Sequence, residues 1–178
     1  MQSLVLGLTL FRILAAPCIF IAAIFFEKHW LAFWLFNLAA LTDYLDGKLA
    51  REFNLESRLG KILDPIGDKL LVLFAIISVI VFTNDFNVAF MGAFILARDF
   101  WVSALREYSS SYKLSDATNV TFVAKTKTTF QFIALSMFFL GAAAELALVT
   151  FLAKFALIIS VLLACKSAID YTQKTLFR

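Results

Sequence analysis

The sequence predicts an all-α integral membrane protein with six transmembrane helices, both termini in the cytoplasm, and a single domain over residues 1–178. Of its 178 residues, 62% are hydrophobic and only 16% are charged, whereas soluble domains are about 45–50% apolar and about 25% charged. A soluble domain of this length cannot bury so much apolar surface, because chain size limits the fraction buried on folding. The apolar runs are also continuous, whereas the strands of a transmembrane β-barrel alternate apolar and polar residues.

Six apolar stretches reach the length of about 20 residues that a spanning helix needs. In chain order they cover residues 8–27, 30–50, 61–82, 86–106, 126–146 and 148–170. The first stretch lacks a small-residue cleavage pattern, so we interpret it as a retained span rather than a signal peptide. The residues before Arg12 either belong to this span or lie along the membrane interface. Short turns at 27–29, at 83–85 and near Glu145 alternate with longer polar connections at 51–60 and 107–125.

The distribution of Lys and Arg predicts the orientation, since cytoplasmic loops carry the excess of these residues. One set of helix ends holds eleven of them: Arg12, Lys48, Arg51, Arg58, Lys61, Arg106, Lys113, Lys125, Lys127, Lys174 and Arg178. The opposite turns hold Lys28 alone. Both termini and both long connections are therefore expected in the cytoplasm. The net charge of +3 is too small to suggest a nucleic-acid partner.

Four aspartates stand out, because charges within membrane helices are costly and therefore mark candidate functional sites. Asp43 and Asp46 lie three residues apart near the cytoplasmic end of the second stretch. Asp64 and Asp68 lie four residues apart near the cytoplasmic start of the third. Residues at these spacings share one face of a helix. The connection at 51–60 is short enough to make the two helices antiparallel neighbours, so the four acids are expected at similar depth.

Four facing carboxylates would repel one another strongly unless cations separate them. Oxygen-only ligands select a hard divalent ion, Mg²⁺ or Mn²⁺, and two such ions can clamp a phosphate ester for in-line displacement. Gly47, Ala50 and Gly60 are small enough for a diphosphate to approach the backbone. Arg51 adds a forked donor for phosphate oxygens. The sequence therefore predicts a two-metal phosphotransfer site.

The spacing of these residues resembles the signature of the CDP-alcohol phosphotransferase family. The match covers all eight fixed positions of that signature: Asp43, Asp46, Gly47, Ala50, Arg51, Gly60, Asp64 and Asp68. A pattern of this length is specific, unlike a lone glycine motif. The resemblance implies six transmembrane helices, usually in a homodimer. One departure is that the family's usual Pro-Asn before the first helix is absent, with 1–7 in its place.

The resemblance also implies a role for each position. Asp43, Asp46 and Asp64 are expected to bind the two metal ions, and Asp68 to bind metal and act as the general base. Gly47, Ala50, Arg51 and Gly60 are expected to contact the cytidine diphosphate. In the implied reaction an alcohol attacks the lipid-side phosphorus of a CDP-linked lipid and releases CMP. Because adjacent cations weaken Asp68 as a base, we expect a late, metal-assisted proton transfer.

Three further segments resemble the bacterial phosphatidylglycerophosphate synthases within this family. They are 64–70, with Gly67 in place of the usual Ala; 97–107, with Asp99 in place of the usual Glu; and 125–131. The resemblance implies glycerol 3-phosphate as the acceptor. A phosphorylated acceptor needs cations, and four candidates could line a polar cavity: Arg98, Arg106, Lys125 and Lys127. Alternatively, Arg106, Lys125 and Lys127 merely mark the cytoplasmic interface.

The predicted function is transfer of the phosphatidyl group from CDP-diacylglycerol to glycerol 3-phosphate, which yields phosphatidylglycerophosphate and CMP. The expected location is a bacterial-type inner membrane, with the active site facing the cytoplasm. Another acceptor, such as phosphatidylglycerol, serine or inositol phosphate, is the main alternative. A small membrane transporter is a second alternative, but a proton or ion path should place charges near the midplane, where this chain has few.

Overall fold

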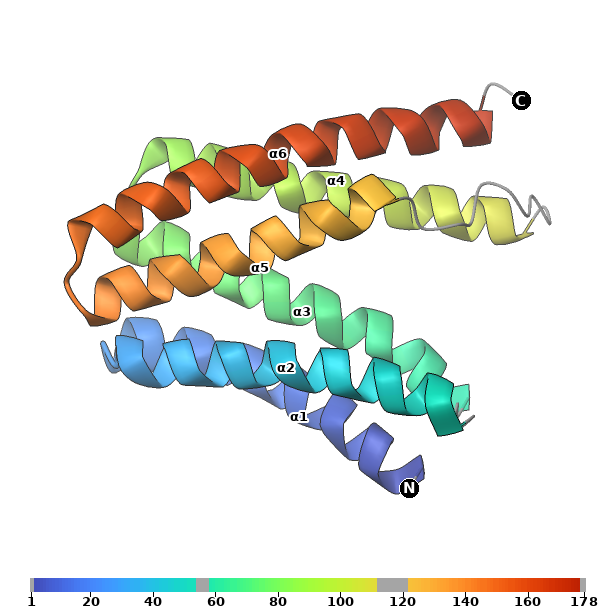
Figure 1. The fold of residues 1–178 in the computed structure, drawn as a ribbon, viewed down its shortest axis with the longest axis horizontal. Helices are drawn as coiled ribbons and strands as arrows, with labels where there is room; N and C mark the ends of the chain where they lie inside the picture. The colour runs from blue at the N-terminus through green and yellow to red at the C-terminus, as the bar shows by residue number, and fades with distance from the viewer. Residues whose placement is uncertain (1, 54–57, 112–121, 177–178) are drawn as a thin grey trace. The chain divides into compact units, whose positions relative to one another are not determined.

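The protein is all-helical in the computed structural model (Figure 1). The structure describes residues 2–53, 58–111 and 122–176; the side chains of 2–5, 44–53, 58, 61, 122–125 and 176 lie outside this description. The helices, in order, are α1 (Gln2–Phe20), the π-helical η1 (Ile21–Phe25), α2 (His29–Phe53), α3 (Arg58–Thr83), α4 (Phe86–Ser111), α5 (Phe122–Ala143) and α6 (Ala147–Leu176).

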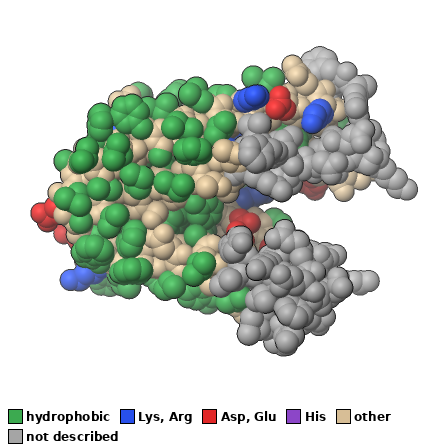
Figure 2. Space-filling model, viewed as in Figure 1, with side chains coloured by type: hydrophobic (Ala, Val, Ile, Leu, Met, Phe, Trp, Pro, Cys, Tyr) green, Lys and Arg blue, Asp and Glu red, His purple; other side chains and the backbone are tan. Residues whose placement is uncertain are grey.

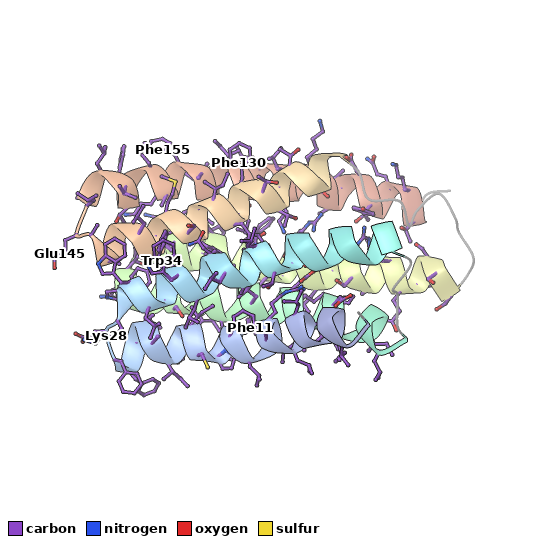
Figure 3. All side chains as sticks on the ribbon, turned by 60° about the horizontal axis from the view of Figure 1, so that its bottom comes forward. Phe11, Lys28, Trp34, Phe130, Glu145 and Phe155 are labelled. Carbon is purple, nitrogen blue, oxygen red and sulfur yellow. The ribbon has the colours of Figure 1, made fainter. Side chains whose placement is uncertain are left out.

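Four described segments are long and apolar enough to cross a membrane: Leu6–Phe25, Ile62–Thr83, Phe86–Ser111 and Ala147–Thr175. They correspond to four of the six predicted stretches. The other two stretches, 30–50 and 126–146, lie in α2 and α5, and the count of six spans stays a prediction. Hydrophobic side chains cover most of the described face in Figure 2. Phe11, Trp34 and Phe155, labelled in Figure 3, are all exposed, as suits side chains that face lipid.

The first helix begins earlier than the apolar stretch that predicts it. Residues before Arg12 continue α1 without a break from Gln2, and the segment that is long and apolar enough to cross a membrane begins at Leu6. The placement of the residues before Leu6 relative to the membrane stays a prediction. The earlier start of α1 matters for the site, because it places Thr9 and Arg12 inside a regular helix.

The chain divides into two compact units, which leaves the single domain a prediction. The first unit comprises Met1–Asn84 and Leu135–Thr150. In this unit α1 packs against both α2 and α3 (Figure 1). Its buried small residues allow close helix approach; they are Ala15, Ala16, Ala22, Ala23, Ala32, Ala39 and Ala75. Phe139 fills the remaining space, with its ring centroid 5.7 Å from that of Phe36 and 5.8 Å from that of Phe82.

The second unit comprises Asp85–Ala134 and Phe151–Arg178. Its core forms where α6 packs on α4, and Val102 and Leu105 surround the buried ring of Tyr171. One face of α6 is buried at intervals of three or four residues, which is the helical repeat: Leu157, Ser160, Ala164, Ser167, Tyr171 and Thr175. The hydroxyls of Ser109 and Thr175 lie 3.3 Å apart at one end of this interface.

Each of the three predicted short turns contains one residue with a positive φ: Glu27 at 51°, Asn84 at 46° and Glu145 at 55°. This left-handed conformation is a common way to end a helix. After the second turn Asp85 caps α4, because its Oδ1 accepts the backbone N–H of Asn87 at 2.8 Å and that of Val88 at 3.4 Å. Lys154 donates to the second oxygen, Oδ2, at 2.6 Å.

The contacts of Asp85 make the stability of the fold depend on pH under acidic conditions. The Lys154 ammonium and the Asn87 N–H together hold the pKa of the Asp85 carboxyl below its ordinary value. Because the pKa of Asp85 is lower in the folded state, the ionised carboxyl stabilises the fold at any pH above the ordinary Asp pKa of about 3.9. This contribution is lost as the pH falls from that value through the lowered pKa. Asp85→Ala is therefore expected to lower the melting temperature by a few degrees at pH 7. The difference from the unsubstituted protein should shrink toward pH 3, and a constant difference would contradict the charge contribution.

Two glycines give a matched pair of stability predictions. A Cβ on Gly141 would clash with Thr150 Oγ1 and lie 3.0 Å from the Thr150 backbone nitrogen, whereas a Cβ on Gly7 would meet nothing within 4 Å. Overpacking of this kind costs about 1–3 kcal/mol, and alanine in an open helical site gains about 0.5–1 kcal/mol over glycine. Thermal unfolding in detergent should therefore show Gly141→Ala destabilised and Gly7→Ala unchanged or stabilised. Equal effects would contradict the close approach at Gly141.

Candidate active site

The first unit brings aspartates from two helices to one face of α1. Arg12 Nη1 lies 2.9 Å from Asp43 Oδ1, on α2, and 2.5 Å from Asp68 Oδ1, on α3. One turn earlier on α1, the Thr9 hydroxyl donates to Asp64 Oδ1 at 2.6 Å. Two carboxylates that contact one nitrogen atom must lie close together. The structure thus places Asp43 of α2 and Asp68 of α3 at the same level.

Helix periodicity explains why these contacts occur in pairs. Thr9 and Arg12 are three residues apart on α1, and Asp64 and Asp68 are four apart on α3, so each pair shares a face. Gly67 lies between the two aspartates, and a Cβ there would be 3.4 Å from Ile13 Cγ1 and 3.7 Å from Arg12 Cδ. These are ordinary contact distances, so the alanine that is usual at this position in similar sequences would also fit.

The remaining residues of the predicted signature are described only in part. The side chains of Asp46, Gly47, Ala50 and Arg51 lie outside the described residues, although the backbone there continues α2. Gly60 is described and buried in the first turn of α3. The predicted contacts of these residues with the cytidine diphosphate therefore stay predictions.

The described donors suit a hard divalent cation in their chemistry. Asp43, Asp64 and Asp68 offer only carboxylate oxygens, which are ligands of Mg²⁺ and Mn²⁺. Within the described side chains, no group of three or more Asp, Glu, His or Cys is close enough to hold an ion. The described acids instead contact Arg12 and Thr9. The structure thus shows carboxylates from α2 and α3 at one location, with Arg12 at the point where Asp43 and Asp68 meet.

Sequence analysis did not assign Thr9 or Arg12 to the site. Arg12 counts there only as one of the Lys and Arg residues that mark the cytoplasmic side. In the structure its side chain is fully buried, at 0% exposure. One signal could have revealed it, because Arg12 is the only charged residue among the first 26. An isolated charge in an otherwise apolar helix needs a partner of opposite charge.

A second polar cluster lies within the second unit and contains two of the predicted acceptor-binding residues. Lys127 Nζ donates to Asp99 Oδ1 at 2.7 Å, and Arg98 Nη1 donates to the same oxygen at 2.9 Å. Arg98 Nη2 donates to the Ser167 hydroxyl on α6. Arg98 and Lys127 are both buried, which disfavours the alternative that Lys127 merely marks the interface. Two cations thus share one carboxylate.

The other two predicted acceptor-binding residues are not part of this cluster as described. Arg106 lies two turns along α4 from Arg98, where its Nη2 donates to the Tyr171 hydroxyl at 3.2 Å. Its guanidinium carbon lies 5.3 Å from the centroid of the Tyr171 ring. The side chain of Lys125 lies outside the described residues. The structure therefore joins Arg98 to Lys127 and gives Arg106 a different partner.

Gln131 and two serines of α6 are polar residues of this region that sequence analysis left unassigned. Gln131 follows Lys127 by one turn of α5 and is 1% exposed. Neither atom of its side-chain amide has a hydrogen-bond partner among the described residues. Ser160 donates to the backbone carbonyl of Lys127 at 3.3 Å. Ser160 and Ser167 could have been found from their place on the three-to-four residue repeat of α6.

Comparison with known proteins decides the family. The sequence profile of the CDP-alcohol phosphatidyltransferases matches residues 5–165. The chain belongs to this family. The family resemblance inferred from the aspartate spacing is therefore confirmed. CDP-alcohol phosphatidyltransferases generally depend on a divalent metal ion, and carboxylate oxygens such as those of Asp43 and Asp68 suit such an ion.

Three curated relatives share one name. The chain is 38% identical over 142 residues to the CDP-diacylglycerol–glycerol-3-phosphate 3-phosphatidyltransferase of Cereibacter sphaeroides, a match that covers 78% of this chain and 63% of that protein. It is 36% identical over 132 residues to the protein of the same name from Escherichia coli K12, which covers 72% of each. The Shigella flexneri protein of this name matches to the same extent, 36% over 132 residues. The match thus spans less than two thirds of the Cereibacter protein.

Proposed function

We propose that this CDP-alcohol phosphatidyltransferase transfers the phosphatidyl group of CDP-diacylglycerol to glycerol 3-phosphate and releases CMP. The observation that carries the proposal is the meeting of Asp43 and Asp68, from different helices, at one atom of Arg12. The relatives at 36–38% identity, all named for this acceptor, support the choice of glycerol 3-phosphate.

In the proposed membrane arrangement, all six apolar stretches cross a bacterial inner membrane and both termini lie in the cytoplasm. The excess of Lys and Arg at one set of helix ends supports this orientation. The four aspartates lie at those ends, so the active site would face the cytoplasm, where glycerol 3-phosphate is available. A homodimer is the expected assembly, as the family resemblance implies.

Asp43, Asp46, Asp64 and Asp68 would hold two Mg²⁺ or Mn²⁺ ions. When bound, these ions neutralise the diphosphate and the leaving CMP. Asp68 would accept the proton of the acceptor hydroxyl late in the displacement. Gly47, Ala50, Arg51 and Gly60 would contact the cytidine diphosphate, with Arg51 donating to its phosphate oxygens. Arg12 and Thr9 orient the carboxylates from α1 in this scheme.

Arg98 and Lys127 would bind the phosphate of the acceptor. Their shared carboxylate, Asp99, holds the two cations side by side, and a pair of adjacent cations suits a dianionic phosphate. Serine, which has no phosphate, would not need such a pair. Arg106 and Lys125 are further candidates for the same phosphate on the basis of sequence alone.

The test is release of CMP from CDP-diacylglycerol by the purified protein in detergent, with a panel of acceptors. We expect turnover with glycerol 3-phosphate in Mg²⁺ or Mn²⁺ and none in EDTA. Inositol phosphate, serine and phosphatidylglycerol are the other acceptors in the panel. Preference for one of these would reassign the substrate within the family, and absence of CMP release with every acceptor would overturn the proposal.

A further inference from the structure

The side chain of Arg12 is buried against two carboxylates and is not exposed to lipid or water. Its side chain is completely buried, and Nη1 is 2.5 Å from Asp68 Oδ1 and 2.9 Å from Asp43 Oδ1. A cytoplasmic flanking arginine would extend its guanidinium toward water. Burying it is costly unless acids compensate the charge. The burial therefore links Arg12 to the aspartates.

Two residues one turn apart on α1 contact two aspartates one turn apart on α3. Thr9 donates to Asp64, and Arg12 donates to Asp68. Arg12 also reaches Asp43 on α2, so a single side chain connects all three helices of the site. The backbone of α3 passes close to Arg12 between the two aspartates, since a Cβ on Gly67 would be 3.7 Å from Arg12 Cδ.

We propose that Arg12 is a resident counter-cation of the aspartate cluster. It holds Asp43 and Asp68 together when no divalent ion is bound, and Thr9 fixes the orientation of Asp64. This inference rests on the proposed metal site. The Arg12 contacts involve Oδ1 of each carboxylate, and each carboxylate has a second oxygen that can bind a metal ion. Arg12 is thus a positioning residue, and its charge partly replaces that of the ions in the empty site.

The proposal predicts how metal binding changes when the charge is removed. In Arg12→Gln the metal-free site has lost its cation, so the carboxylates repel one another more strongly. A bound ion then relieves more repulsion than in the unsubstituted protein. We expect the apparent dissociation constant for Mn²⁺ to fall by about tenfold, which corresponds to about 1.4 kcal/mol. The melting temperature in EDTA should fall, and saturating Mn²⁺ should restore much of the loss.

The experiment measures Mn²⁺ affinity by electron paramagnetic resonance and thermal unfolding with EDTA or Mn²⁺, in detergent. Arg12→Lys keeps the charge and should behave like the unsubstituted protein. Lys28→Gln, the matched control, removes one positive charge from an exposed position in an outer turn of the same unit and should change neither quantity. Equal destabilisation in EDTA and Mn²⁺ with unchanged or weaker Mn²⁺ affinity would overturn the counter-cation role. Failure of the unsubstituted protein to bind Mn²⁺ would instead overturn the metal site itself.

Discussion

Asp68→Asn is expected to reduce CMP release by about 10²–10⁴-fold, the range typical of a lost general base. The amide keeps the size of the side chain, so the packing of α1 against α3 should persist. It cannot accept the proton of the acceptor hydroxyl, and it is a poorer metal ligand. Binding of CDP-diacylglycerol should largely remain, because the other three aspartates and the cytidine-diphosphate residues are unchanged. Steady-state CMP release and equilibrium binding of the lipid measure the two effects separately.

The control for this substitution is Glu27→Gln, which makes the same chemical change at an exposed position in a short turn of the same unit. It should leave turnover unaltered. Normal turnover of Asp68→Asn would remove Asp68 from the general-base role. Loss of lipid binding together with turnover would make its main contribution metal binding instead.

Arg98→Ala is expected to raise the KM for glycerol 3-phosphate by roughly 10- to 150-fold, with a smaller change in the KM for CDP-diacylglycerol. A hydrogen bond to a charged group contributes about 1.5–3 kcal/mol, and every 1.4 kcal/mol is tenfold. Asp99 would keep Lys127 as a partner, at 2.7 Å, which limits the disturbance of the cluster. Initial rates with each substrate varied in turn give both KM values.

Lys166→Ala serves as the matched control, because it removes an exposed cation next to Ser167 on α6. Its KM values should be unchanged. An unaltered KM for glycerol 3-phosphate in Arg98→Ala would remove Arg98 from the acceptor site. Equal rises in both KM values would indicate a general loss of structure, which thermal unfolding of the variant would then reveal.

The meeting of the aspartate pairs could be predicted from the sequence, because it depends only on the helical repeat and on the length of one connection. A spacing of four residues places Asp64 and Asp68 on one helical face, and the connection at 51–60 is short enough to make α2 and α3 neighbours. The three short turns are similarly predictable, since each separates two apolar runs. Their positive φ values at Glu27, Asn84 and Glu145 are consistent with helix ends at those points.

The role of α1 could not be predicted in the same way. Periodicity shows which residues share a face, but not how α1 is rotated toward its neighbours. That rotation depends on how small residues such as Ala15, Ala16 and Gly67 pack, which sequence spacing does not specify. Arg12 therefore counts as a flanking charge in the sequence and becomes a buried partner of two acids in the structure. The contact of Ser167 with Arg98 could not be predicted either, because it depends on how α6 packs on α4.

Counting bound Mn²⁺ is the most direct test of whether the aspartates of α2 and α3 form one binuclear site. Electron paramagnetic resonance of the detergent-purified protein with CDP-diacylglycerol should show two Mn²⁺ per chain, close enough to couple magnetically. Asp43→Asn and Asp64→Asn, one from each helix, should each abolish the coupled signal. Two Mn²⁺ that remain coupled in both variants, or an unsubstituted protein that binds none, would contradict the site.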